Sequence, residues 1–297
     1  MNHFKFNQYK QILIAALLLI FAGTARAQYY QLPKGELSFY LKGLNSKLNI
    51  DMGENGDSDT RFGAGFGVQY NYYIARGVSF SGALEYQSYR SETILDNFAD
   101  SYGLRDAEGD DMIFRNSANV YHERQSVGML NIPLLIQWET KGHSRKLFTA
   151  TGIQLGLPLA ANYKATAFDL ETSGYFPQWD AHLTSPRFMG FGSWETKHSG
   201  KEKLKLKSSY SFLFELGLKQ QLKEFRHLYV SAYVELGLND LTKGSDPQAL
   251  IGYNLDNPTD FHHASVIYSS PQATGNDYVN KVTSQSFGFR MRYSFSW

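Results

Sequence analysis

Histidine lies beside acidic and hydroxyl side chains in four segments of the chain, a combination that activates the nucleophile of many hydrolases. The groups are His122 with Glu123, His182 near Asp180 and Ser185, His198 with Ser199, and His262 and His263 near Asp260. A catalytic set needs its members within hydrogen-bond distance, and proximity in a polar segment does not provide that. Adjacent histidines on an extended segment point opposite ways, so a metal site there would need other ligands. We therefore expect no catalytic residues, no metal site and no cofactor.

The composition of the 297-residue chain excludes several classes of protein. There is no cysteine, which excludes disulfides, iron–sulfur clusters and a thiol nucleophile. The 29 Lys and Arg nearly balance the 28 Asp and Glu, so we expect no nucleic-acid partner. Only one long apolar run is present, which argues against a bundle of membrane-spanning helices. A β-rich chain with many Phe, Tyr and Gly remains.

The first 27 residues predict a cleaved signal peptide. Lys5 and Lys10 precede an apolar stretch, residues 12–22, that is too short to span a bilayer. Ala25-Arg26-Ala27 then forms a small-x-small cleavage site before Gln28. An uncleaved anchor is the alternative, which the short apolar stretch disfavours. We expect an exported protein whose mature part, residues 28–297, is a single domain.

After position 28, hydrophobic and polar residues alternate along the sequence. This period of two indicates β-strands. Eight segments show the pattern: 36–42, 62–74, 78–87, 130–139, 147–163, 210–219, 228–239 and 286–297. Pro133 and Pro158 fall inside two of them, where a bulge or bend is expected.

The connections between these segments are short and long in turn. Short turns occupy residues 75–77, 141–145 and 223–227, and long polar loops occupy 50–60, 92–122, 164–205 and 240–281. All short turns therefore lie at one end and all long loops at the other. This layout predicts an all-β, eight-stranded antiparallel up-and-down barrel in which the first and last strands pair.

The space inside such a barrel decides which face of each strand points outward. An eight-stranded barrel is only just wide enough to be filled by its own side chains. The small Gly, Ser, Asn and Gln residues of the polar face fit that space, whereas the many large aromatic residues of the apolar face do not. We therefore predict a transmembrane barrel with its apolar face toward lipid. A soluble, ligand-carrying barrel is the alternative.

Charged residues on the polar face predict a plugged lumen. They are Lys42, Glu85, Glu215, Lys219, Glu235, Arg290 and Arg292. Burying a charge without a partner costs roughly several kcal/mol of folding free energy, so we expect these opposite charges to be in contact. A narrow polar lumen filled in this way would not act as a diffusion pore.

The C-terminus carries the most specific pattern in the sequence. Hydrophobic residues occupy every second position to the last residue: Phe287, Phe289, Met291, Tyr293, Phe295 and Trp297. This ending resembles the terminal signature of bacterial outer-membrane barrels, which the barrel-assembly machinery recognises.

Together these features resemble the outer-membrane β-barrel domain family common in Bacteroidetes, related in layout to the small OmpA and OmpX barrels and including PorT-like proteins of the porin family. The resemblance rests on Ala25-Arg26-Ala27-Gln28, on FGAGFGV at residues 62–68, on NIPLLI at residues 131–136, and on the C-terminal ending. It implies location in the outer membrane, contact with outer-membrane lipid and lipopolysaccharide, short periplasmic turns and long extracellular loops. The PorT-like branch serves type IX secretion and gliding.

The third long loop contains a dense group of aromatic residues. They include Tyr175, Phe176, Trp179, Phe188, Phe191 and Trp194. Exposed aromatics are frequent in recognition surfaces, so this loop could contact an envelope protein, a glycan or a neighbouring barrel; capping of the barrel mouth is the alternative. We expect a non-enzymatic integral outer-membrane protein with interaction loops. An accessory of a secretion or gliding machine and a lipid-modifying barrel enzyme are the alternatives.

Overall fold

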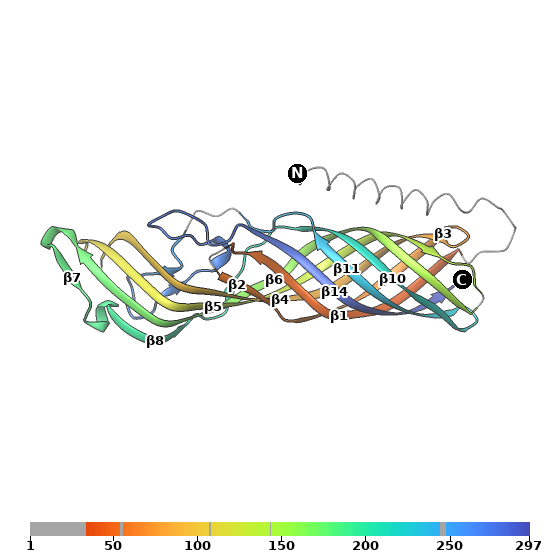
Figure 1. Ribbon diagram of the computed structural model, residues 1–297, viewed down its shortest axis with the longest axis horizontal. Helices are drawn as coiled ribbons and strands as arrows, with labels where there is room; N and C mark the ends of the chain where they lie inside the picture. Colours follow the sequence, from red (N-terminus) through yellow and green to blue (C-terminus); the bar gives the residue numbers. More distant parts are fainter. Residues whose placement is uncertain (1–33, 54–55, 107, 143, 244–247) are drawn as a thin grey trace, which may run out of the picture. The chain divides into compact units, whose positions relative to one another are not determined.

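The computed structural model describes residues 34–53, 56–106, 108–142, 144–243 and 248–297. The predicted signal peptide, residues 1–27, lies outside these ranges. Eight long antiparallel strands in the described part form a closed ring (Figure 1). They are β1 (Gly35–Asp51), β3 (Phe62–Ala75), β4 (Val78–Arg105), β5 (Asp111–Glu139), β6 (Arg145–Phe176), β10 (Ser209–Lys223), β11 (Arg226–Gly237) and β14 (Lys281–Ser296). Each corresponds to one predicted segment, which confirms the predicted barrel.

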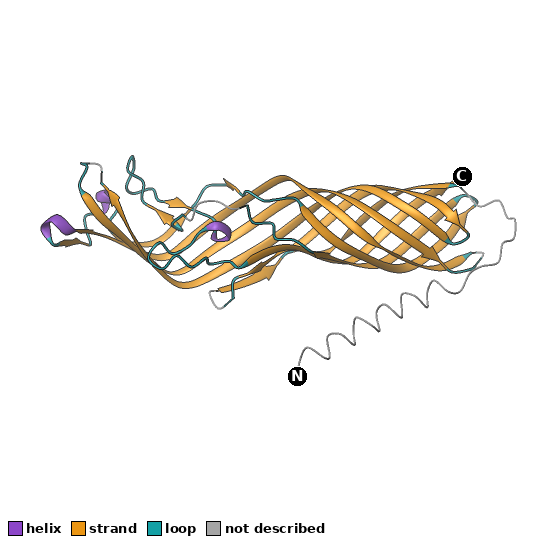
Figure 2. Ribbon diagram, turned by 90° about the horizontal axis from the view of Figure 1, so that it is seen from above, coloured by secondary structure: helices purple, strands orange, loops and turns teal. Residues whose placement is uncertain are grey.

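The ring closes between the first and last of these strands. β1 pairs with β14 from Glu36 opposite Ser296 to Asp51 opposite Lys281. Each remaining long strand pairs with the next one along the chain, and the crossing strands of the closed barrel are clear in Figure 2. Short turns lie at one end, between β3 and β4, between β5 and β6, and between β10 and β11. Gly77 has a φ of 77°, a left-handed conformation that glycine adopts without strain.

Side chains alternate between the two faces of the ring as the sequence predicts. One exposed apolar side chain from each strand illustrates the outer face: Leu41, Phe66, Leu84, Ile136, Ile153, Leu216, Val230 and Phe289. Most of the intervening positions are buried and polar or charged, and Leu135, Ala150 and Leu213 form a small apolar group among them. An apolar exterior around a polar interior is the pattern of a barrel in lipid. No helix within the described ranges is long and apolar enough to span a bilayer.

Three strands continue far beyond the barrel and form a structure that we call the distal sheet. β4, β5 and β6 pair as far as Arg105 opposite Asp111 and Ile113 opposite Tyr175. Short strands β2 (Gly56–Thr60), β7 (Ala181–Leu183), β8 (Gly192–His198) and β9 (Glu202–Lys203) add to its edges. The prediction of a loop over residues 92–122 was therefore wrong, because β4 and β5 form one long hairpin across most of that range.

Polarity reverses on passing from the barrel to the distal sheet. Its outer face carries exposed charges such as Arg90, Arg124 and Lys164, while its inner face is mostly apolar, with a few buried polar side chains such as Glu123. The connection from β11 to β14 folds over this inner face, and we call residues 248–280 the cover segment. It contains β12 (Ile251–Gly252), β13 (His262–His263) and the short helix η3 (Val266–Tyr268).

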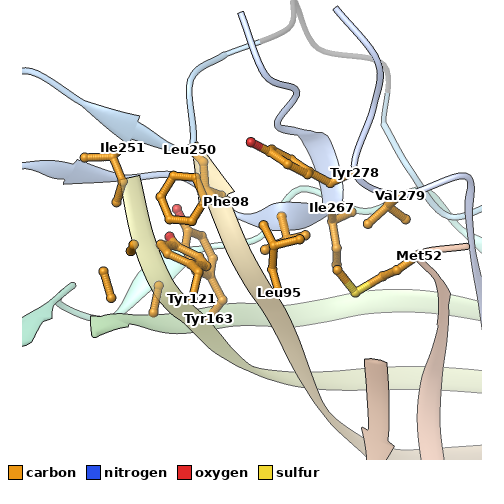
Figure 3. Close-up of a cluster of buried hydrophobic side chains, with 14 of the residues drawn as sticks. Met52, Leu95, Phe98, Tyr121, Tyr163, Leu250, Ile251, Ile267, Tyr278 and Val279 are labelled. Carbon is orange, nitrogen blue, oxygen red and sulfur yellow. The ribbon is translucent and has the colours of Figure 1, made fainter. Parts of the chain in front are cut away.

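A hydrophobic core lies between the cover segment and the distal sheet. In Figure 3, Ile251 and Ile267 of the cover segment face Leu95, Phe98 and Tyr121 of the sheet. The sheet and its cover therefore form a small packed body of their own, which buries the apolar side chains that would otherwise face water.

Candidate functional site

One cluster of paired charges inside the barrel joins five strands. Lys42 Nζ lies 2.6 Å from Glu85 Oε1 and 3.2 Å from Glu235 Oε2. Arg290 contacts Glu215 at 2.7 Å and Glu85 at 3.5 Å. The side chains of all five residues have an exposed fraction of 0%. Buried charges persist only when they are paired in this way, so the five residues depend on one another.

A second cluster lies near the short turns. Lys219 Nζ contacts Glu36 at 2.9 Å and Glu139 at 3.0 Å. Tyr229 donates a hydrogen bond to Glu36 at 2.5 Å, and Tyr73 donates to Glu139 at 2.9 Å. The sequence analysis named Lys219 but missed both carboxylates. Glu36 and Glu139 lie on the polar faces of the predicted segments 36–42 and 130–139, and this position was the signal that could have identified them.

Neutral polar groups connect and extend these clusters. Arg292 donates to Gln137 Oε1 at 2.9 Å and lies 4.0 Å from the centre of the Tyr229 ring. Tyr89 donates to Glu235 at 2.6 Å, and Gln154 donates to the same carboxylate at 2.7 Å. The lumen is therefore crossed by hydrogen bonds between side chains of several strands.

The glycines of β3 provide the space for the large lumen side chains. A Cβ added at Gly67 would lie 2.6 Å from the Tyr40 ring, and one added at Gly65 would lie 3.3 Å from Lys42 Cε. Tyr40 in turn donates to Glu85 at 2.8 Å. The FGAGFGV sequence thus permits an interior of this composition.

A single carboxylate fastens the cover segment to the distal sheet. Glu123 accepts hydrogen bonds from Ser265 Oγ at 2.7 Å, from the Val266 backbone N–H at 2.8 Å and from Gln125 at 3.0 Å. The next residue on the strand, Arg124, is exposed on the charged outer face of the distal sheet. Glu123 therefore lies outside the part of the barrel whose outer face is apolar. Burial raises the pKa of Glu123 to about 7, and these three hydrogen bonds oppose that rise.

The predicted histidines make individual hydrogen-bond, ion-pair and ring contacts. His122 pairs with Glu92, His182 Nε2 is 3.1 Å from Ser173 Oγ, and His198 Nδ1 is 2.9 Å from Thr166 Oγ1. His263 stacks on Tyr121, and burial lowers the pKa of His263 to about 4. These contacts differ from the pairs that sequence proximity suggested. Within the described ranges, no group of three or more His, Asp or Glu side chains could hold a metal ion.

The six aromatic residues of the third loop occupy different environments. Phe176 and Phe191 are buried in the core of the distal sheet, and Trp194 packs against that core. Tyr175 donates a hydrogen bond to Asp180 at 2.8 Å. Trp179 and Phe188 are 61% and 74% exposed, so any contact with a partner would involve mainly these two side chains.

The C-terminal residues belong to β14 or follow it directly. Phe287, Phe289, Met291 and Phe295 are exposed on the apolar outer face, as is Trp297. Tyr293 packs edge-on against Phe295 with ring centres 5.1 Å apart. Trp297 donates its backbone N–H to the Gly35 carbonyl at 3.0 Å, which joins the end of the chain to the start of β1.

The fold and its two faces define an integral outer-membrane barrel, and comparison with known proteins identifies the family. The family model described as the outer membrane protein beta-barrel domain matches residues 34–243, and the chain belongs to that family. It is therefore an outer-membrane protein. No curated protein matches the chain.

Solved outer-membrane proteins cover most of the chain at low identity. The outer membrane protein OprG from Pseudomonas aeruginosa is 11% identical with a TM-score of 0.34, covering 89% of this chain and 96% of its own. The attachment invasion locus protein Ail of Yersinia pestis is 11% identical with a TM-score of 0.28, covering 88% of this chain and 99% of its own.

Proposed function

We propose that the protein is a non-enzymatic envelope protein with a plugged lumen and an extracellular recognition surface on its distal sheet. The buried cluster of Lys42, Glu85, Glu215, Glu235 and Arg290 is the observation that carries the first part. Its ion pairs join strands around the ring and leave no side chain of the cluster exposed. Moving one of these charges aside would leave its buried partner unpaired, which opposes opening.

Recording from the purified mature protein in a planar bilayer tests the plugged lumen. We expect no steady conductance. A variant in which these five residues and also Glu36, Glu139, Lys219 and Arg292 are replaced by Ser is the matched control, and it should conduct because both charge clusters and their bulk are removed from the lumen. Large, steady currents through the unmodified protein would overturn the proposal.

The surroundings of the barrel follow from its two ends and its outer face. The exposed apolar band would contact outer-membrane lipid and lipopolysaccharide, and the barrel-assembly machinery would recognise the β14 ending during biogenesis. The distal sheet and cover segment, at the end opposite the short turns, would face the outside of the cell and offer Trp179 and Phe188 to an envelope partner.

Cross-linking in intact outer membranes, followed by mass spectrometry of the purified protein, distinguishes two roles: a barrel that acts alone and a PorT-like accessory of a larger machine. We expect the protein to be recovered alone. Stoichiometric recovery of secretion or gliding components would instead make it a part of such a machine. Loss of a lipid A modification on replacing His182, His198 or His262 would argue for a lipid-modifying enzyme.

A further inference from the structure

Four exposed basic side chains lie together on the outer face of the distal sheet, where it adjoins the barrel. We call them the basic patch: Arg90 of β4, Arg124 of β5, Lys164 of β6 and Lys203 of β9. Arg124 pairs directly with Lys164. The adjacent row of paired residues crosses four strands and contains Arg90, Ser126, Asn162 and Lys203. Paired residues share a face of a sheet, so the four cations lie on the same side.

The basic patch begins where the apolar outer face of the barrel ends. On β6, Leu159 is 61% exposed, and the first exposed charge beyond it is Lys164. On β4, Arg90 lies twelve positions after Val78, the first residue of the strand. With a rise of about 3.3 Å per residue and a strand tilt of about 40°, this is roughly 30 Å along the barrel axis. The apolar band of such barrels is about 25 Å tall, so Arg90 lies at the level of the lipid headgroups.

The basic patch brings like charges together without pairing them. Arg124 and Lys164 are directly opposite each other, an arrangement that destabilises a sheet. Within the described ranges, Arg90, Lys164 and Lys203 form no ion pair. The protein alone therefore bears an electrostatic cost here, and an anion lying against the patch would remove it.

Carboxylates lie at one edge of the basic patch only, beside β2. Glu92 accepts a hydrogen bond from Arg61 Nε at 2.5 Å and from Arg124 Nε at 3.0 Å. Asp59 of β2 pairs with Glu92 across the strands, and Asp57 precedes it on the same face. The Arg124 side chain is still 59% exposed, whereas that of Glu92 is 14% exposed. Glu92 thus fixes the position of the Arg124 guanidinium and leaves it accessible to a ligand.

The surroundings of the basic patch restrict the class of ligand. Arginine and lysine are the side chains that bind phosphate groups most strongly. Leu159 and Tyr86, on the barrel side of the patch, are exposed and would contact acyl chains. A ligand that uses both surfaces carries phosphate groups next to several acyl chains, which describes a phosphorylated glycolipid.

We propose that the basic patch binds the phosphate groups of lipid A, the acylated anchor of lipopolysaccharide. The inference rests on the proposed function in that the distal sheet faces the outside of the cell and the barrel contacts lipopolysaccharide. It assigns that contact to particular residues and to the phosphate groups of the lipid.

Native mass spectrometry of the whole mature protein in a neutral detergent tests the proposal. The lipids to compare are lipid A with two phosphate groups, the same lipid A after removal of its phosphates, and phosphatidylglycerol. We expect the phosphorylated lipid A to bind about tenfold or more tightly than the dephosphorylated form, and more tightly than phosphatidylglycerol. This preference should weaken as the salt concentration is raised.

A triple variant removes three charges of the basic patch: Arg90→Gln, Arg124→Gln and Lys164→Gln. Its affinity for phosphorylated lipid A should fall about tenfold, to that of the dephosphorylated form. Because the opposed charges are gone, the lipid-free variant should unfold at the same or a higher urea concentration than the unmodified protein. If the triple variant fails to fold, Lys164→Gln alone removes one of the two opposed charges and should weaken binding severalfold.

A matched control removes three exposed charges elsewhere on the distal sheet and its edge: Arg105→Gln, Arg115→Gln and Arg187→Gln. The loss of net charge is the same, and these residues lie further from the barrel. The control should bind lipid A like the unmodified protein.

Equal binding of phosphorylated and dephosphorylated lipid A would overturn the proposal, as would unchanged affinity of the folded patch variants or an equal loss in the control. Phosphatidylglycerol that binds as tightly as lipid A would overturn the assignment to lipopolysaccharide. These outcomes are independent of the bilayer recording. A protein that conducts no current and does not distinguish the two forms of lipid A would leave the plugged barrel standing and remove only the lipid A site.

Discussion

At the scale of single residues, Arg290 is one of the two cations that hold the lumen cluster together, the other being Lys42. Arg290 pairs with both Glu215 and Glu85. Replacing it by Met leaves two buried carboxylates short of a partner, so Arg290→Met should lower the free energy of unfolding by roughly 3–5 kcal/mol. Urea unfolding of the protein in detergent micelles, followed by the loss of β-sheet circular dichroism, measures this.

A control for charge removal itself is available in the distal sheet. Arg105 and Asp111 form an ion pair whose side chains are both 76% exposed. Arg105→Met should change the free energy of unfolding by less than about 1 kcal/mol, because water solvates the remaining carboxylate. Equal effects of Arg290→Met and Arg105→Met would contradict a paired, buried network.

The pH dependence of stability should report on Glu123. Because burial raises its pKa from 4.5 to about 7, the folded protein retains a proton that the unfolded chain loses as the pH rises through this interval. Stability from this residue is therefore present in full below pH 4.5 and falls by roughly 3 kcal/mol by about pH 7. His263, with its lowered pKa, contributes the opposite slope between about pH 4 and 6.5.

Comparing the protein with Glu123→Gln isolates the Glu123 contribution, since His263 is common to both. The free energy of unfolding of the unmodified protein minus that of the variant should fall between pH 4.5 and 7 and level off above pH 8. Urea unfolding at a series of pH values provides the curve. A difference that stays constant across this range would show that the Glu123 carboxyl is not protonated in the folded protein near neutrality.

At the scale of elements, the space that β3 provides inside the barrel can be tested with two glycines. A Cβ at Gly67 would meet the Tyr40 ring at 2.6 Å and the Leu84 carbonyl at 2.7 Å, whereas one at Gly82 would have its nearest neighbour, Leu134 Cδ2, at 3.6 Å. Gly67→Ala should destabilise the barrel by roughly 1–3 kcal/mol, since Tyr40 must move away from Glu85. Gly82→Ala should be within about 1 kcal/mol of the unmodified protein. Thermal unfolding of both variants makes the comparison, and equal losses would contradict the role assigned to Gly67.

The barrel strands were predictable from the sequence, and the distal sheet was not, for a physical reason. Along each barrel strand every second residue is buried from one end to the other, so the sequence shows a period of two. At Asn97 and Asp169 the backbone turns left-handed, with φ of 51° at each, and the buried set moves by one position, from Leu95 to Phe98 on β4 and from Ala167 to Leu170 on β6. Asn and Asp tolerate this conformation. A pattern that changes phase within one strand resembles a loop.

The solvent around the strands also changes between the barrel and the distal sheet. In the barrel the rule is apolar outward, because lipid surrounds it; in the distal sheet the rule is apolar inward, because water surrounds it. The amino-acid sequence does not show at which residue of a strand the surrounding lipid gives way to water. The same reasoning explains the aromatic residues of the third loop, where Phe176 and Phe191 fill a core that only the cover segment creates. Pro158 behaved as predicted, since the register of β5 against β6 shifts opposite it, at Gly128 and Met129.

At the scale of the whole molecule, the proposed orientation places the distal sheet outside the cell and the short turns in the periplasm. The chain contains no cysteine, so a single introduced thiol is the only one that a maleimide can label. Glu108 lies in the exposed turn at the far end of the β4–β5 hairpin, and Glu224 lies in the exposed turn between β10 and β11.

A membrane-impermeant maleimide should therefore label Glu108→Cys on intact cells and leave Glu224→Cys unlabelled until the outer membrane is permeabilised. Both positions are exposed in short turns, so neither substitution should disturb folding, and equal labelling of the two variants in detergent verifies this. Labelling of Glu224→Cys alone on intact cells would invert the orientation. The exposed Trp179 and Phe188 would then face the periplasm, and the partner of the recognition surface would be a periplasmic one.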